Sequence, residues 1–551
     1  MSNSFTRKHE AMTFVQQVVS VSVVAVFLII GATEEARGEG RAELVLTYGE
    51  SGLPRGNVFH VGEKVFATIR LSGLADPPPY VGQIQVTGSV VDAQGREVLR
   101  VDNEPENYWQ VLGGDTLEAT LVIDSDRKGI PPGSYTLIAM VQHLRTAKRF
   151  EVRRDFVWKN AEGFTTDEFR WLLDLGEDYP AGPLLQPGRV YWLFHRNLNT
   201  TFVNRSLSIR KQVFLYSPNE EMPIGKTGVF EHSTIIPENR NLPERIWSSI
   251  GLEFSRAEDI QVSVDFMDMP SGDCALDRIS ARVASTIAPR PDEHKTDKPF
   301  MVLTHGALGK VRQTAYLGGE DIWLTVGFAD PGKGALSQQI VKCFLRDREG
   351  ELLKEVRLDE LFGHSGFSQS FFIELIKIPG SSVIEDLETI SEIELQLTQK
   401  ETGKTTVLTA PIRFSPTEQF SAFNVRLSAD SWGEVPAGEF LTAGATYHLQ
   451  CDITKYAIQD YAMNVTHAVK AFTADGQPIE GTELVLEHAK ELSVAEKLES
   501  KHPLSMQISL NRPGKFILRW TFTDNLSGET FTTDLPVEVV SPFQFMKTPE
   551  R

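Results

Sequence analysis

The sequence predicts an all-β protein with four tandem β-sandwich domains after an N-terminal apolar export helix. Its 551 residues are too many for one core, because a single domain rarely grows past ~250 residues. A glycine turn followed by a run of alternating apolar residues recurs along the chain. Two further motifs keep their spacing from that turn, which is typical of one structural unit repeated several times.

The recurring glycine turn is the clearest of these motifs, with a period of about 125 residues. After the first turn, Val65, Ala67 and Ile69 occupy alternate positions, which is the two-residue period of a strand. Similar runs follow the other turns, so we expect a comparable strand in each repeat. The glycines at the matching position of the four turns are Gly62, Gly188, Gly319 and Gly444.

Two other motifs lie downstream of the turn. A hairpin turn with Asp and Gly, the residues that tight turns favour, occurs in the first, third and fourth repeats. A Pro-Gly pair opens a late strand in the first and fourth repeats. We expect a strand at 164–175, which occupies a first-strand position, and a short helix at 491–500. The hairpin glycines are Gly95, Gly350 and Gly476, and the pairs are Pro132-Gly133 and Pro513-Gly514.

The repeats meet near 160–163, in the polar stretch 288–298 and near 415–418, and the stretch 288–298 contains Pro289, Pro291 and three acidic residues, as is typical of a linker. These boundaries place repeat 1 at 42–160, repeat 2 at 161–288, a linker at 289–299, repeat 3 at 300–415 and repeat 4 at 416–551.

The order of glycine turn, alternating strand, hairpin and Pro-Gly strand resembles bacterial immunoglobulin-like and macroglobulin-type sandwich domains. The resemblance covers nearly all of residues 42–541, although repeat 2 lacks the hairpin glycine and repeats 2 and 3 lack the Pro-Gly pair. Macroglobulin-type protease traps also carry a reactive Cys-Gly-Glu-Gln thioester, and this sequence has no such motif. The resemblance therefore implies a fold and does not imply protease trapping.

Residues 1–41 have the pattern of a signal peptide or signal anchor. Arg7 and Lys8 precede the apolar run Val18–Ala32, and a small-residue pattern at Ala36-Arg37-Gly38 follows it. The run is 15 residues long, shorter than the ~20 that a membrane-spanning helix needs. We therefore favour cleavage, with an uncleaved anchor at 15–32 as the alternative. Either way the chain is expected in the periplasm, on the cell surface or outside the cell, and membrane contact is expected only through this segment.

The net charge and the cysteine content argue against two further classes of protein, those that bind nucleic acids and those held together by disulfides. A net charge of −19 would repel a phosphate backbone and argues against nucleic-acid binding. Three cysteines, Cys274, Cys343 and Cys451, are too few for a disulfide framework. Cys343 and Cys451 lie on the apolar phase of strands, where a buried, unreactive thiol is expected.

The sequence contains no recognisable catalytic or cofactor-binding motif. The Gly363-His364-Ser365-Gly366 segment lacks the spacing of a nucleophile elbow. One acidic segment is a candidate calcium site, because Ca²⁺ prefers carboxylate and other oxygen ligands. Its spacing matches no known calcium loop, however, and solvated aspartates are the favoured alternative. The candidates are Asp265, Asp268, Asp273 and Asp277.

Tyr108, Trp109, Trp247 and Trp432 lie in segments interpreted as loops. Exposed aromatic rings there can stack on sugars or anchor a partner protein, whereas packing onto the local core is the alternative. We expect a non-enzymatic extracytoplasmic scaffold or protein-binding protein, with adhesion or spacing as its role. The alternatives are an array of carbohydrate-binding modules and an enzyme with a noncontiguous site. The expected partner is another protein or a glycan.

Overall fold

The chain is all-β wherever the structure describes it. Apart from the short 3-10 helix η4 (Pro542–Phe545), the regular elements of the described residues are strands, β1 to β34. The computed structural model describes residues 41–73, 81–103, 106–109, 116–125, 129–144, 147–174, 179–186, 189–218, 221–243, 245–254, 259–283, 300–304, 315–317, 320–328, 339–356, 360–362, 372–378, 390–415, 419–433, 435–438, 440–493, 501–510 and 512–546.

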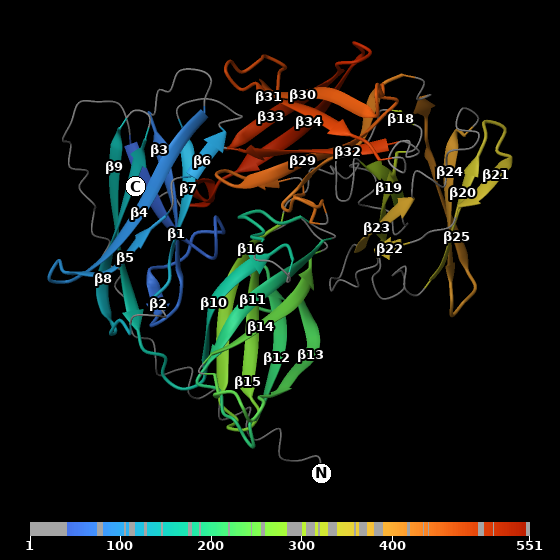
Figure 1. Cartoon of the computed structure of the whole chain (residues 1–551). Helices are drawn as coiled ribbons and strands as arrows, with labels where there is room; N and C mark the ends of the chain where they lie inside the picture. Colours follow the sequence, from blue (N-terminus) through green and yellow to red (C-terminus); the bar gives the residue numbers. More distant parts are fainter. Residues whose placement is uncertain are drawn as a thin grey trace. The chain divides into compact units, whose positions relative to one another are not determined.

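The first group of strands forms two sheets, one with the order β1-β3-β7 and one with the order β2-β9-β8-β4-β5, in which β6 also pairs with β4 (Figure 1). A cluster of buried apolar side chains includes residues from both sheets, such as Leu46 of β1 and Leu137 of β8. The strands are β1 (Arg41–Thr47), β2 (Val58–His60), β3 (Val65–Ser72), β4 (Val81–Asp92), β5 (Glu97–Asp102), β6 (Glu106–Trp109), β7 (Leu117–Ile123), β8 (Gly133–His143) and β9 (Arg149–Lys159).

The second group has a sheet of order β10-β11-β14 and a sheet of order β13-β12-β15-β16. Its own apolar cluster again joins the two sheets, for example through Leu193 of β11 and Val264 of β15. The strands are β10 (Thr165–Leu172), β11 (Val190–Leu198), β12 (Ser206–Tyr216), β13 (Gly225–Ile235), β14 (Arg245–Glu253), β15 (Asp259–Asp268) and β16 (Cys274–Arg282).

The third group has a sheet of order β17-β19-β23-β22, a sheet of order β21-β20-β24-β25, and the short pair β18-β26. A third apolar cluster includes Leu324 of β19 and Leu395 of β24. The strands are β17 (Phe300–Thr304), β18 (Tyr316–Leu317), β19 (Ile322–Phe328), β20 (Gln339–Arg346), β21 (Leu352–Val356), β22 (Glu360–Phe362), β23 (Phe372–Ile378), β24 (Glu392–Gln399), β25 (Thr405–Pro411) and β26 (Phe414–Ser415).

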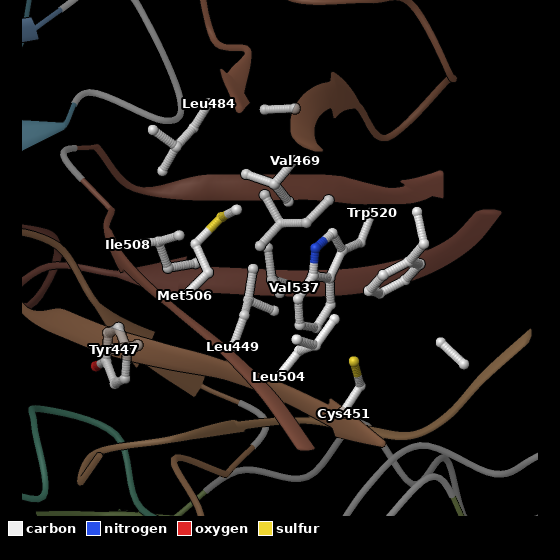
Figure 2. Close-up of a cluster of buried hydrophobic side chains, with 14 of the residues drawn as sticks. Tyr447, Leu449, Cys451, Val469, Leu484, Leu504, Met506, Ile508, Trp520 and Val537 are labelled. Carbon is white, nitrogen blue, oxygen red and sulfur yellow. The ribbon is translucent and has the colours of Figure 1, made fainter. Parts of the chain in front are cut away.

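The fourth group has a sheet of order β27-β29-β32 and a sheet of order β28-β34-β33-β30-β31. Figure 2 shows side chains of both sheets, among them Leu449, Met506 and Trp520, gathered in one cluster. The strands are β27 (Ser421–Ser428), β28 (Phe440–Thr442), β29 (Thr446–Thr454), β30 (Ala462–Thr473), β31 (Leu484–Glu491), β32 (Lys501–Ser509), β33 (Gly514–Asp524) and β34 (Thr530–Val540).

The four groups share one strand order. Each has a three-strand antiparallel arrangement that begins with its first strand, as in β1-β3-β7 and β27-β29-β32. In each, a short parallel pair brings an early segment beside the last strand of the group or the residue that follows it. These pairs are β2 with β9, Leu185 with Val283, β18 with β26, and β28 with β34.

Two of the predicted turn glycines, Gly188 and Gly319, lie outside the described residues, and the other two can be compared with the sequence. Gly62 and Gly444 have φ of 80° and 84°, a region that glycine adopts without the steric cost of a Cβ. β10 confirms the strand expected within 164–175. Of the helix expected at 491–500, Glu491 belongs to strand β31, and residues 494–500 lie outside the described residues.

The export segment expected at 1–41 lies outside the described residues except for Arg41, the first residue of β1. In the part of the chain that the structure describes, no helix has the length and apolar character needed to cross a membrane.

Candidate functional site

Within the described residues, a group of buried charges lies where the first glycine turn meets strands β10 and β11. A β-bulge in β10 lies between Asp167 and Arg170, and Glu168 within it has φ of 55°. The bulge places Asp167 and Glu168 next to each other in the buried interior. We call this group the junction cluster. Its members are Glu63, Asp167, Glu168, Arg196 and Asp277.

Glu63 follows Gly62 in the turn before β3, and its carboxylate is buried. Oε1 accepts hydrogen bonds from Arg55 Nη1 at 2.6 Å and from the Glu168 backbone N–H at 3.1 Å. Oε2 accepts one from the His60 backbone N–H at 2.9 Å. A single carboxylate therefore holds the turn closed and joins it to β10.

Arg196, only 1% exposed, binds the other side of the cluster. Its Nε and Nη2 donate to the two oxygens of Asp167 at 2.8 and 2.9 Å. Nη2 also donates to the Gly62 carbonyl at 2.9 Å, and Nε lies 3.2 Å from Glu168 Oε2. A planar guanidinium suits this arrangement because its donors are fixed in a fork that matches a carboxylate.

The crowding of carboxylates changes their protonation. Burial raises the pKa of Asp167 to about 6, and nearby Glu63 adds to the effect. Burial likewise raises the pKa of Glu168 to about 7. Asp277 of β16 accepts a hydrogen bond from Thr166 Oγ1, and burial with the nearby charges of Glu63 and Asp167 raises its pKa to about 7. The cluster therefore takes up protons near neutral pH.

Part of this group has the composition of a metal site. Ligand atoms of His60, Glu63 and Asp167 lie within 4.8 Å of one another, and burial lowers the pKa of His60, which keeps its imidazole neutral. The carboxylate oxygens, however, already accept from Arg55, Arg196 and backbone N–H groups. A cation here would compete with two arginines, so the geometry fits an ion-pair network better than a metal centre.

The structure does not bring the four calcium candidates together. Asp265 is exposed on β15, where it faces Leu276, whereas Asp277 pairs with the buried Val264 and joins the junction cluster. Asp268 is buried and organises the turn after β15, because its Oδ2 accepts from the Thr201 backbone N–H and from Ser271 Oγ. Asp273 is exposed in that turn.

Two of the four aromatic candidates have described side chains. Trp247 lies on strand β14, is 44% exposed and stacks on Phe194 at 4.9 Å between ring centroids. Trp432 lies in the loop after β27 and is 82% exposed. Tyr108 and Trp109 belong to strand β6, and their side chains lie outside the described residues. The interpretation as loops is thus right for Trp432 and wrong for the other three.

Hydrogen bonds with buried side chains fix the backbone of the loop that carries Trp432. The buried Asp430 accepts hydrogen bonds from the backbone N–H groups of Trp432 at 3.1 Å and Val435 at 2.8 Å. Gln450 Nε2 donates to the Ser431 carbonyl at 2.7 Å. Gly433 has φ of 81°, and a Cβ there would lie 1.9 Å from Gln450 Oε1. The loop therefore presents Trp432 on a fixed backbone.

The thiols match the expectation for structural cysteines. Cys343 and Cys451 are buried, and Cys274 is exposed. Burial raises the pKa of the Cys343 thiol to about 12 and raises that of Cys451 as well. Neither buried thiol is therefore ionised enough at neutral pH to act as a nucleophile.

Comparisons with known proteins give structural neighbours only, since no protein-family model and no curated protein matches the chain. The native conformation of E. coli alpha-2-macroglobulin matches at 11% identity, over 92% of this chain and 34% of that chain, with a TM-score of 0.16. The same protein activated by porcine elastase matches at 13% identity, over 91% of this chain and 44% of that chain, with a TM-score of 0.14. Dimeric latent PorU from Porphyromonas gingivalis matches at 12% identity, over 72% and 36%, with a TM-score of 0.23.

The chain spans between 34% and 44% of the length of these neighbours. The macroglobulin-type proteins that the sequence motifs resemble are among them. In its described residues this chain is itself all-β, with many sheets.

Proposed function

We propose that this protein is a non-enzymatic extracytoplasmic scaffold that binds another protein through loops of four tandem immunoglobulin-like domains. The proposed domains are 42–160, 161–288, 300–415 and 416–551. The buried residues of each apolar cluster come from one of these ranges, although Tyr48 of the first range also packs against the cluster of the second. The common strand order supports one fold used four times, and loops on such rigid scaffolds are where binding residues concentrate.

The observation that carries the binding role is the loop of Trp432. A side chain of this size is rarely left 82% exposed. Its backbone is already fixed by Asp430 and Gln450, so little entropy would be lost when a partner covers the ring. Tryptophan is also among the residues that contribute most to binding energy when a partner buries them.

Export is the second part of the proposal. Its support is the pattern of basic residues, apolar run and small residues within 1–41. The acidic net charge of −19 keeps such a protein soluble in an aqueous compartment.

The test is crosslinking in intact cells that express the whole chain, followed by purification from the cell envelope. We expect one crosslinked partner protein that is lost in Trp432→Ala. It should be retained in Val485→Ala, which removes another exposed apolar side chain of the same repeat. An unchanged partner in Trp432→Ala would contradict the binding role, and recovery from the cytosol with the leader intact would contradict export.

A carbohydrate-binding role is the second candidate, favoured by the same exposed ring, because a flat aromatic face can stack on a sugar. Retention of the whole chain on a glycan array, lost in Trp432→Ala, would select this role over protein binding.

A further inference from the structure

A pair of histidines bridges the two sheets of the fourth repeat at their edges. His488 lies on β31, the edge strand of the five-stranded sheet, and His502 lies on β32, the edge strand of the three-stranded sheet. Their Nε2 atoms are 3.3 Å apart, with ring centroids 5.4 Å apart. The contact between these side chains therefore joins two edges that belong to different sheets.

Both rings belong to the inward faces of their strands. His502 alternates with Leu504 and Met506, which are members of the buried cluster. His488 lies directly opposite the buried Val465 of β30. Since His488 is half-buried and His502 is buried, the pair lies at the rim of the core, where solvent reaches one ring.

We propose that His488 and His502 form a binding site for a divalent transition-metal ion of the zinc class, which ties the two sheets together at this edge. Two imidazole nitrogens bound tetrahedrally to zinc at about 2.0–2.1 Å lie roughly 3.3–3.4 Å apart. The separation of the two Nε2 atoms is 3.3 Å. The half-buried ring leaves room for water to complete the coordination.

Two side chains beside the pair, Lys490 and His467, belong to its surroundings. Burial lowers the pKa of His488, and the positive charge of Lys490 lowers it further. His467, on the neighbouring strand β30, is affected in the same way, since burial and His488 lower its pKa to about 4. Trp520 Nε1 donates to His467 Nδ1 at 3.3 Å. The His467 ring is therefore part of the hydrogen bonding within the core and is not one of the proposed ligands.

The ligand type also selects the ion. Imidazole nitrogen suits zinc, copper and nickel, whereas calcium and magnesium prefer oxygen. The histidine pair would therefore prefer zinc to calcium. The aspartates that the sequence offers as a calcium candidate have oxygen ligands and would not share this preference. The metal site does not depend on the proposed binding role of Trp432.

The test is calorimetric titration of the tag-free whole chain with ZnCl₂. We expect one ion bound per chain, with the affinity reduced about tenfold or more in His488→Asn because one of two ligands is lost. His232→Asn removes an exposed histidine on β13 of the second repeat and should leave binding unchanged. Equal binding by wild type and His488→Asn, or binding of CaCl₂ as tight as that of ZnCl₂, would overturn the proposal.

A second measurement needs no variant. Electron paramagnetic resonance of the whole chain loaded with one equivalent of Cu²⁺ should show two coordinated nitrogens. A spectrum that reports only oxygen ligands would overturn the proposal even if the substituted chains failed to fold.

Discussion

Removal of the Arg196 charge is the sharpest test of the junction cluster. The substitution Arg196→Met keeps an unbranched stem of similar length and deletes the guanidinium. Asp167 then loses both of its donors, and Glu168 loses the ion pair at 3.2 Å. The side chains of Arg196, Asp167 and Glu168 are each 1% exposed, so water cannot replace the lost partner without opening the structure.

The expected cost follows from this burial. Removing one partner of a buried ion pair typically destabilises a protein by about 3–5 kcal/mol, because the other charge stays behind uncompensated. We expect Arg196→Met to lie in that range above neutral pH. The double variant Arg196→Met with Asp167→Asn should recover part of the loss, because it removes one of the stranded charges. Arg519→Met is the matched control, because the side chains of Arg519 and its partner Asp534 are both 43% exposed. Exposed ion pairs contribute only ~0–1 kcal/mol to stability.

The assay is urea denaturation of the whole chain followed by tryptophan fluorescence. A multidomain chain need not unfold in one step, so each transition is fitted separately. Hydrogen exchange at the backbone N–H of Glu168, which donates to Glu63, reports opening of the cluster directly. If Arg196→Met costs no more than Arg519→Met, or if Asp167→Asn brings no recovery, the ion pairs of the cluster do not stabilise the junction.

Three further predictions concern other parts of the chain. Stability should increase as pH falls from about 8 to about 6.5, because the folded chain binds protons on Asp277 and Glu168 that the unfolded chain releases; Asp277→Asn should flatten this slope in urea titrations, and buried neutral histidines such as His195 oppose it at lower pH. Leu449→Ala should cost about 2–5 kcal/mol in one unfolding transition and leave the others unchanged, since it creates a cavity in one core; a shift of every transition would contradict separate cores. Gly433→Ala should cost about 1–3 kcal/mol from backbone strain and reduce crosslinking through the exposed tryptophan; unchanged crosslinking would contradict the need for a fixed loop.

The strands could be predicted because their signals are local. Val65, Ala67 and Ile69 alternate in the sequence, and all three are buried in the first apolar cluster. The hairpin glycines were also predictable, since Gly95 and Gly350 have positive φ and the preceding aspartates accept hydrogen bonds from the turn backbone, as Asp92 does from Gln94.

The second face of a strand could not be predicted from the same pattern. Phe66 and Thr68 lie between the alternating residues of β3 and are buried as well. The guanidinium of Arg170, from the second group of strands, lies 5.8 Å from the centre of the Phe66 ring. A two-residue period identifies the face toward the strand's own core, whereas cover from another group of strands leaves no periodic signal.

For a related reason, the sequence could not show which of the candidate residues lie together. Closeness in sequence suggested that four aspartates act together, yet alternation along β15 and β16 places Asp265 and Asp277 on different faces. The junction cluster joins residues more than a hundred positions apart, such as Glu63 and Glu168. One signal was present, because Asp167, Glu168 and Arg196 lie in runs that also contain large apolar residues such as Phe169 and Phe194. A charge in such a run indicates either a bulge or a buried partner.

A second long-range contact uses the same chemistry. Arg70 of β3 and Glu118 of β7 form an ion pair at 2.8 Å, and Ser541, the N-cap of η4, donates to Glu118 and accepts from Arg70. Burial raises the pKa of Glu118, as it does for the carboxylates of the junction cluster. Buried ion pairs add little net stability compared with apolar packing. A segment that packs in the wrong place, however, leaves a buried charge without its partner, which is strongly destabilising. The apolar clusters therefore account for the stability of each group of strands, and the buried charges decide which segments of different groups meet.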